Sequence, residues 1–535
     1  MTDPFRKSTP SPWVDLLYTD CVSRVVVNGN VTDTFQVQAG VRQGCPLSVV
    51  LFILAMEPLA CAIRQDSSIR GLVVPGSGGK EAKMTVYMDD MTLLCSTNSS
   101  VVRALGWSDC FSKASGAKLN RAKSEILYLN WREPKLELGL KETDDRLKIL
   151  GVEIGKDMEK VNWEKRLPGI KWKLLQWEDR DLTMTGKVLV VNAEVLASLT
   201  FLAATLSAPR SFVTLLVRAI FQFIWGTKQE NLKREIMYKP LEKGGKAVPK
   251  VEVKLNALFL TPILNAVLKS SNDSLWNSFA KFWVGRDILT RVGRRPPLDT
   301  PHAETRPRLY DRALALWETT RLSDPPLGEV SRRTVERGLC PQVERMVPVG
   351  IMIEDMCVQV WRNVNSPFLS NANKDLAWKA VHSCLPTRVW LKRRQSARSP
   401  QCPRSYCGGE ESVRHVFWAC SFAQGVWGLV MPWLKLLFRE PGEIYILYGN
   451  LNRGDRTKWD RWWAVINCMK EGLWRSRNLV VFKEYYLQPE AVVKVGLTLV
   501  RDYILSEKKK HSEMELKELW KIGDGFLSNV VFDVF

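Results

Sequence analysis

Residues 84–95 read MTVYMDDMTLLC, in which Asp89 and Asp90 stand between two short apolar runs. Runs of this length and composition predict two strands joined by a tight turn. Two adjacent carboxylates would be costly to bury without a cation. Mg²⁺ prefers hard oxygen ligands from one or two carboxylates and from substrate phosphates. The pattern is compatible with a hairpin that holds a divalent cation, but an Asp-Asp pair alone more often marks a solvated turn, and the surrounding motifs decide between the two.

The segments on either side of this hairpin predict a mixed fold of helices and strands. Residues 22–27 and 30–38 flank Asn28-Gly29, a pair that is typical of a two-residue turn between antiparallel strands. Residues 46–63 begin with a proline and are almost wholly apolar, which predicts a helix buried on most sides. A second helix is expected to end at Gly116, where a C-cap glycine fits.

The rest of the chain is mostly helical in its pattern. It is rich in tryptophan, and an Arg- and Pro-rich stretch without periodicity interrupts it. The spacing of Trp459 and Trp463 favours packing in a core over stacking on bases. The sequence therefore predicts five regions: an α+β region at residues 1–150, a helical region at 151–285, a linker at 286–310, a helical region with a cysteine cluster at 311–435 and a terminal helical region at 436–535.

Charge and composition narrow the class of protein. The chain is globular in composition, with 45% hydrophobic and 25% charged residues, and carries a net charge of +20. Such a basic excess favours a polyanionic partner such as nucleic acid, and the alternative is charge that serves solubility alone. The 12 cysteines are scattered through apolar runs, which predicts reduced thiols in an intracellular protein, cytoplasmic or nuclear. Val188–Ala208 could span a bilayer by length, but its polar residues favour a buried helix, and we expect no membrane partner.

Cys402, Cys407, His415 and Cys420 follow the spacing C-x4-C-x7-H-x4-C. Three thiolates and one imidazole complete a tetrahedral set for Zn²⁺, and a complete set predicts a structural site without an open position for chemistry. The alternative is a group of ordinary reduced cysteines beside a surface histidine. We expect His382, which precedes the cluster, to be a packed or surface residue and not a fifth ligand.

A basic stretch lies just before and within this cluster, without an acidic residue from position 388 to 404. Cations grouped in this way suit contacts with RNA or DNA phosphates, and the alternative is a solvated helix face. The candidate phosphate-binding residues are Arg388, Lys392, Arg393, Arg394 and Arg398, with Arg404 further along.

The hairpin and its surroundings together resemble the LINE-type (non-LTR retrotransposon) reverse transcriptases. Residues 40–48, GVRQGCPLS, are similar to the palm motif that precedes the catalytic aspartates, and residues 116–125, GAKLNRAKSE, are similar to the motif that follows them. Residues 13–18, 223–226 and 243–245 continue the resemblance. Many LINE enzymes carry alanine where this chain has Met88. The region that contains the cysteine cluster, with WKAVH at 378–382 and LPTR at 385–388, resembles the zinc-binding region of such proteins.

This resemblance implies a partial reverse-transcriptase palm of antiparallel strands with packed helices, followed by mostly helical thumb and C-terminal regions. Asp89 and Asp90 would hold Mg²⁺ for two-metal nucleotidyl transfer, with RNA and DNA as partners. The residues implied on the nucleotide and template side are Gln43, Gly44, Tyr87 and Lys123.

One motif that the resemblance implies is missing from this sequence. Such polymerases need a third carboxylate from an upstream motif. Asp3, Asp15, Asp20 and Asp33 lie in segments unlike that motif. We therefore expect an N-terminally truncated, inactive relative of an RNA-directed DNA polymerase. The alternative is a non-enzymatic nucleic-acid-binding remnant that uses the basic stretch and the zinc knuckle, and a third possibility is a pseudogene product without a role.

Overall fold

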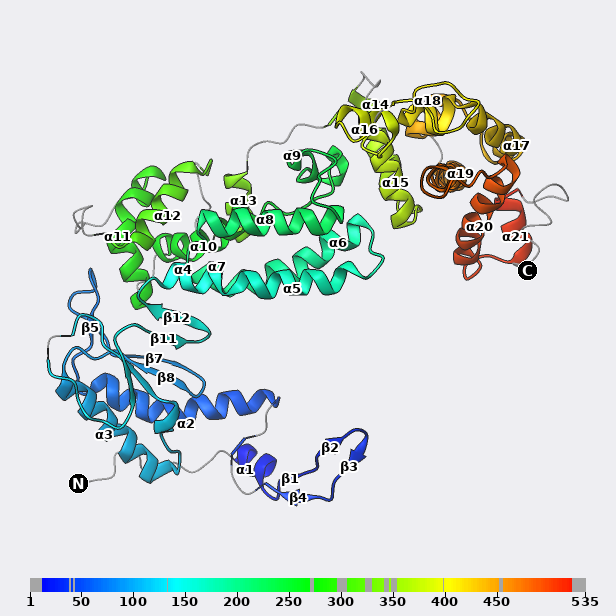
Figure 1. Cartoon of the computed structure of the whole chain (residues 1–535). Coiled ribbons are helices and arrows are strands. Elements are labelled where there is room, and N and C mark those ends of the chain that lie inside the picture. The colour runs from blue at the N-terminus through cyan, green and yellow to red at the C-terminus, as the bar shows by residue number, and fades with distance from the viewer. Residues whose placement is uncertain are drawn as a thin grey trace. The chain divides into compact units, whose positions relative to one another are not determined.

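The computed structural model describes residues 12–37, 40–41, 44–131, 133–269, 274–295, 306–322, 330–340, 346–347, 354–397, 399–451 and 456–521. The chain divides into two compact units, each assembled from segments that are separated in the sequence. Unit 1 comprises residues 1–165, 202–209 and 256–339, and unit 2 comprises residues 166–201, 210–255 and 340–535 (Figure 1).

The strands of unit 1 form two-stranded sheets and no larger sheet among the described residues. Five pairs are antiparallel (β1 with β4, β2 with β3, β5 with β6, β7 with β8, β11 with β12), and β9 and β10 pair in parallel. The strands are β1 Val22–Ser23, β2 Val26–Val27, β3 Asn30–Val31, β4 Phe35–Gln36, β5 Leu72–Val73, β6 Glu81–Ala82, β7 Met84–Tyr87, β8 Asp90–Leu93, β9 Glu125–Leu127, β10 Lys141–Thr143, β11 Arg146–Ile149 and β12 Val152–Gly155.

The predicted Asn28-Gly29 hairpin is confirmed. Both turn residues have positive φ, 50° at Asn28 and 85° at Gly29, as a two-residue turn between twisted strands requires. The turn joins β2 to β3, and β1 pairs with β4 further from it.

The helices of unit 1 surround two apolar cores. They are α1 Pro12–Tyr18, α2 Pro46–Gln65, α3 Asn98–Ser115, η1 Arg121–Lys123, α4 Met158–Glu164, α11 Leu275–Arg291, α12 Arg308–Thr319 and α13 Arg332–Leu339, and α7 Ala197–Thr205 and α10 Val251–Leu268 each have residues in both units. In one core α2 and α3 pack together against one face of the β7–β8 hairpin (Figure 1). Helix α3 ends at Gly116, whose φ of 78° confirms the predicted C-cap.

Helix α2 corrects one expectation. Apart from Ser48 in the first turn, the buried residues of α2 are Leu59, Ala60 and Ile63 in its C-terminal half, whereas Ile53 and Leu54 are more than half exposed. The apolar run therefore predicted the helix correctly but not its burial on most sides.

By length and composition alone, three described helical stretches could cross a membrane, namely Pro46–Gln65, Met184–Thr205 and Val251–Leu268.

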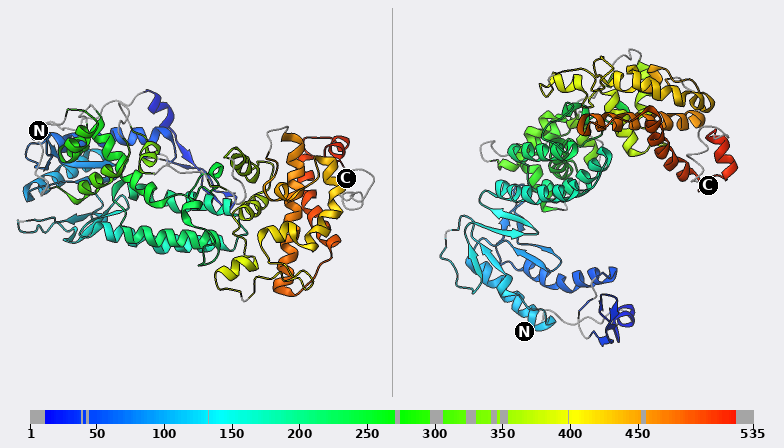
Figure 2. Two further views of the ribbon diagram at one scale, coloured as in Figure 1. Left: turned by 90° about the horizontal axis from the view of Figure 1, so that it is seen from above. Right: turned by 45° about the vertical axis from the view of Figure 1, so that its right-hand side comes forward.

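Unit 2 is helical. Its described elements are α5 Arg166–Glu178, α6 Met184–Val190, the π-helical turn η2 Val191–Leu196, α8 Arg210–Trp225, α9 Arg234–Met237, η3 Leu241–Lys243, α14 Glu354–Val364, α15 Asn371–Val381, α16 Arg388–Arg393, the π-helical turn η5 His415–Ala419, α17 Ser421–Leu437, α18 Glu443–Tyr448, α19 Arg456–Lys483, α20 Pro489–Glu507 and α21 Glu513–Leu519. The long helix α19 packs against α15, α17 and α20, and Figure 2 shows the orange and red helices α19 and α20 side by side. Trp459, Trp462 and Trp463 are buried in this core, as their spacing predicted.

The Gly244 backbone connects the segment that follows η3 with α15 and the residue after it. The Gly244 carbonyl accepts hydrogen bonds from Trp378 Nε1 at 3.0 Å and from His382 Nε2 at 2.7 Å. A Cβ atom at Gly244, whose φ is 88°, would lie 2.7 Å from the Trp361 ring, so only glycine fits. Burial lowers the pKa of His382 to about 4, which keeps its ring neutral at physiological pH. His382 is thus a packed residue, as expected.

Next to this contact, Lys246 is a buried cation. Its Nζ lies 2.6 Å from Asp375 Oδ1 on α15, and Asp375 Oδ2 accepts from the Met184 backbone N–H at 2.6 Å. Residues 239–248, α6 and α15 are therefore held together by one carboxylate.

Lys470 lies fully buried on α19 without a carboxylate among its described contacts. Its Nζ donates to the Ile446 carbonyl at 3.2 Å and lies near the Phe417 and Trp463 rings. Burial lowers the pKa of Lys470 to about 7. In the unfolded chain the pKa of Lys470 stays near its ordinary value of 10.5. Between pH 7 and pH 10.5 the unfolded chain therefore holds this proton more tightly than the folded chain does. The free energy of unfolding therefore rises from pH 7 towards pH 10. Below pH 7 Lys470 is charged in both states, and the whole cost of burying its charge lowers the stability of the folded chain.

We expect Lys470→Met to increase the free energy of unfolding at pH 7 by about 2 kcal/mol, because the penalty disappears with the charge. The same substitution should flatten the rise of stability between pH 7 and pH 10. Denaturant titrations across this range measure both effects. Lys494→Met, at an exposed site on α20, is the control and should change stability by less than about 0.5 kcal/mol. A Lys470→Met protein that is less stable than wild type would contradict the argument.

Candidate functional site

Asp89 and Asp90 lie at the end of the β7–β8 hairpin. Strand register pairs Tyr87 with Asp90, which leaves Met88 and Asp89 as a two-residue turn. Met88 has a φ of 54°, a left-handed conformation that suits such a turn, although Met88 is not a glycine. Both carboxylates and the Tyr87 ring are exposed. Neither carboxylate is buried, so the cost of burying unpaired charges, which the sequence pattern suggested, does not arise here.

Other residues implied by the resemblance lie on separate elements. Gly44 is exposed, with a φ of 84°, just before α2, and Lys123 is exposed on η1. Gln43 lies outside the described residues. The Tyr18 hydroxyl lies 3.1 Å from Ser48 Oγ, which links α1 to the first turn of α2.

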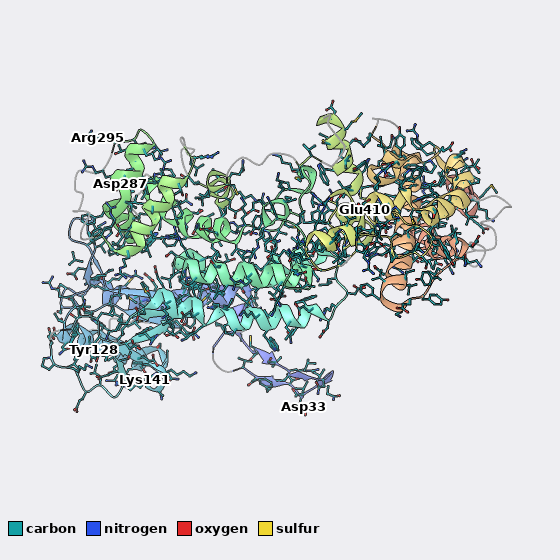
Figure 3. All side chains as sticks on the ribbon, turned by 45° about the horizontal axis from the view of Figure 1, so that its top comes forward. Asp33, Tyr128, Lys141, Asp287, Arg295 and Glu410 are labelled. Carbon is teal, nitrogen blue, oxygen red and sulfur yellow. The ribbon has the colours of Figure 1, made fainter. Side chains whose placement is uncertain are left out.

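A third carboxylate does not join Asp89 and Asp90 within the described part of the chain. A set of three or more metal-ligating side chains occurs there only at the cysteine cluster. Asp33, labelled in Figure 3, belongs to the N-terminal hairpin between β3 and β4. The hairpin therefore offers two exposed carboxylates, which can bind a divalent cation but do not form a complete two-metal site by themselves.

The four predicted zinc ligands come together. The ligand atoms of Cys402, Cys407, His415 and Cys420 all lie within 4.8 Å of one another. Cys407 Sγ is 3.7 Å from Cys420 Sγ and 3.2 Å from His415 Nε2. These separations suit a tetrahedral ion with Zn–S bonds of about 2.3 Å and a Zn–N bond of about 2.0 Å. The donor set therefore fits a structural Zn²⁺ site.

The crowding of the thiols affects their protonation. A hydrogen bond between Cys402 and Cys420 raises the pKa of the Cys402 thiol and lowers the pKa of the Cys420 thiol. The lowered pKa of Cys420 favours its thiolate, which is the form that binds a metal ion.

Local structure positions each ligand. A β-bridge between Gln401 and Glu410 (Glu410 is labelled in Figure 3) closes a knuckle around the first two cysteines, and the Cys402 N–H donates to the Gly409 carbonyl at 2.8 Å. A Cβ atom at Gly409 would lie 2.6 Å from the His415 ring, so this glycine allows the imidazole to approach the knuckle. His415 begins η5, and Cys420 directly precedes α17.

A buried ion pair that the sequence did not predict ties the cluster to α19. Glu411, between the second and third ligands, is fully buried and accepts from Arg477 of α19, from Nε at 2.9 Å and from Nη2 at 2.8 Å. Glu411 also accepts from the Arg388 backbone N–H at 2.7 Å. Arg404 adds a second link, because its guanidinium lies over the Phe422 ring and donates to Ser476 Oγ of α19. These contacts fix the ligand loops to α16 and α19.

The candidate phosphate-binding residues differ in their surroundings. Lys392, Arg393 and Arg394 are exposed on and just after α16, and Arg394 also stacks on Trp390 and donates to the Glu230 carbonyl at 2.8 Å. Arg388 is half-buried. Arg398 lies outside the described residues.

Comparison with known proteins agrees with both parts of this description. Residues 3–154, which include the hairpin, match the family model described as "Reverse transcriptase (RNA-dependent DNA polymerase)". Residues 352–427, which include all four cysteine-cluster ligands, match the family model described as "zinc-binding in reverse transcriptase". The two matches show that residues 3–154 are similar to reverse transcriptases and that residues 352–427 are similar to their zinc-binding region.

A relative among known proteins narrows the class of protein. Over 264 residues, 47% of this chain, the sequence is 26% identical to the "Transposon TX1 uncharacterized 149 kDa protein" of Xenopus laevis. Together with the two family matches, this similarity supports a LINE-like reverse transcriptase with a C-terminal zinc-binding region. The matched stretch covers 20% of the relative's length.

Proposed function

We propose that this chain derives from the RNA-directed DNA polymerase of a LINE retrotransposon, and that Asp89 and Asp90 are the adjacent carboxylates of its Mg²⁺ site. The observation that supports this proposal is the exposed end of the β7–β8 hairpin, with Asp89 in the two-residue turn and Asp90 at the start of β8, within the segment similar to reverse transcriptases. On this proposal Gly44 and Tyr87 line the nucleotide and template side, with Gln43 before them, and Lys123 supports phosphates.

The proposal includes inactivity of the chain by itself. Two-metal nucleotidyl transfer requires carboxylates that hold both ions in fixed geometry. The described residues bring no third acid to the hairpin. We therefore expect the isolated chain to show no DNA synthesis beyond the background of an Asp89→Asn variant.

Primer extension with Mg²⁺ and deoxynucleotides on an RNA template tests this expectation, with wild type and Asp89→Asn compared side by side. Circular dichroism and zinc content establish that both proteins are folded. Extension that Asp89→Asn abolishes would contradict inactivity and would support the catalytic role of the hairpin. Equal background signals from both folded proteins are the expected result.

The second candidate function is nucleic-acid binding without catalysis. It is favoured by the exposed cations of α16, which lie directly before the knuckle that carries the first two zinc ligands. Asp89→Asn should leave the affinity for RNA unchanged if binding uses this surface, and neutral substitutions at Lys392 and Arg393 should weaken binding and reduce its salt dependence.

A further inference from the structure

Unit 2 contains a cavity of about 580 Å³, and the basic helix α16 forms part of its wall. Its walls come from α6, the C-terminal end of α8, α15, α16 and the C-terminal half of α19. Three of the sequence phrases that resemble the LINE enzymes contribute to it, through Trp225, Lys379 and Arg388. Segments distant in the chain thus converge on one concave site of the size that usually accepts a small ligand.

The charges around the cavity are strongly unbalanced. Asp375 lines it, but both of its oxygens already accept from Lys246 and the Met184 N–H. Arg477 also lines it and is paired with Glu411. Lys187, Lys379 and Arg388 remain, and within the described residues none of the three forms an ion pair with a carboxylate. The cavity is therefore cationic and suits an anion.

Two hydrogen-bond donors in the walls lack acceptors. Arg388 Nε and Trp225 Nε1 are both buried from solvent and have no hydrogen-bond partner among the described residues. Buried donors without partners are uncommon and destabilising in folded proteins. Because neither atom has accessible surface on the cavity, a bound molecule would reach them only after the Arg388 and Trp225 side chains rotate.

The same cavity offers aromatic surface. Trp225, Trp474 and Phe482 line it, and the Phe482 side chain is 78% exposed. Aromatic rings beside unpaired cations are the combination that single-stranded nucleic acids use, with bases on the rings and phosphates on the cations.

We propose that this cavity binds one nucleotide unit of a single-stranded nucleic acid, with the phosphate at Lys187, Lys379 and Arg388 and the base against the aromatic wall. This site shares no residue with the Asp89–Asp90 hairpin and does not require polymerase activity, and it rests on the second candidate function, nucleic-acid binding without catalysis. Its failure would therefore leave the proposal for the hairpin intact.

Fluorescence anisotropy of the full chain with labelled oligouridylate and oligothymidylate of about 12 nucleotides tests the site. The double variant Lys187→Gln/Lys379→Gln should bind roughly 10-fold or more weakly than wild type, with a salt slope reduced by about two. Trp225→Leu should weaken binding by roughly 5-fold to 100-fold through lost stacking. The oligouridylate and oligothymidylate arms show whether RNA or DNA is preferred.

The matched control is Lys494→Gln/Lys509→Gln, which removes the same charge at exposed positions outside the cavity. The proposal predicts near-wild-type affinity for this control. Equal losses in the two double variants would overturn it, as would a folded wild-type chain that binds neither oligonucleotide. Displacement of the oligonucleotide by an oligoglutamate peptide at equal concentration would also overturn it, in favour of an acidic peptide as the ligand.

Discussion

Removal of zinc is expected to unfold the helical core around α19, with a loss of helical circular dichroism and a red shift of tryptophan fluorescence. The four ligands lie on the knuckle, η5 and the start of α17, and η5 packs against both α17 and α19. Structural zinc contributes on the order of 10 kcal/mol of folding free energy at neutral pH. That amount is comparable with the entire stability of an ordinary domain.

Cys420→Ser tests this expectation without a chelator. Elemental analysis should find about one zinc per wild-type chain and a large loss in the variant. Cys468→Ser is the control, because Cys468 is a fully buried thiol of the same core that is not part of the cluster. Cys468→Ser should keep its zinc. A wild-type protein that is purified without zinc and is unaffected by chelation would refute the structural role of the metal.

Glu411→Gln is expected to lower the free energy of unfolding by about 3–5 kcal/mol. The substitution leaves Arg477, which is also buried, as an uncompensated charge inside the core. Denaturant titration of the zinc-loaded protein measures the loss. The double variant Glu411→Gln/Arg477→Met should recover much of it, because both charges are then removed.

The matched control for this experiment is Glu443→Gln. Glu443 forms a similar two-bond pair with Arg414, at 2.5 Å and 2.7 Å, but the Arg414 side chain is 61% exposed. Exposed pairs contribute at most about 1 kcal/mol, so this variant should remain close to wild type. Equal losses in Glu411→Gln and Glu443→Gln would show that the burial of the Glu411 pair has no special importance.

The features that the sequence predicted well are those that depend on neighbouring residues. Asn28-Gly29 specifies its turn through backbone conformation, and Gly116 ends α3 for the same reason. The cysteine cluster was also predictable, because its ligands fall within 19 positions and only one simple coordination set accounts for them.

The features that the sequence did not predict depend on contacts between distant segments. No spacing rule pairs Glu411 with Arg477, which is 66 positions further along the chain. The exposure of Ile53 and Leu54 on α2 depends on which elements cover that helix, and its composition cannot show this. The convergence of Lys187, Trp225 and Lys379 on one cavity likewise requires the packing of α6, α8 and α15.

The Gly244 contact sets a limit on how this protein can be divided. A fragment that starts at residue 354 would keep every zinc ligand, yet it would lose the carbonyl that Trp378 and His382 donate to. It would also lose Lys246 and leave the Asp375 carboxylate in α15 without its cation. The smallest fragment that preserves the environment of α15 must therefore include residues 239–248, although these residues lie more than 150 positions before the first zinc ligand.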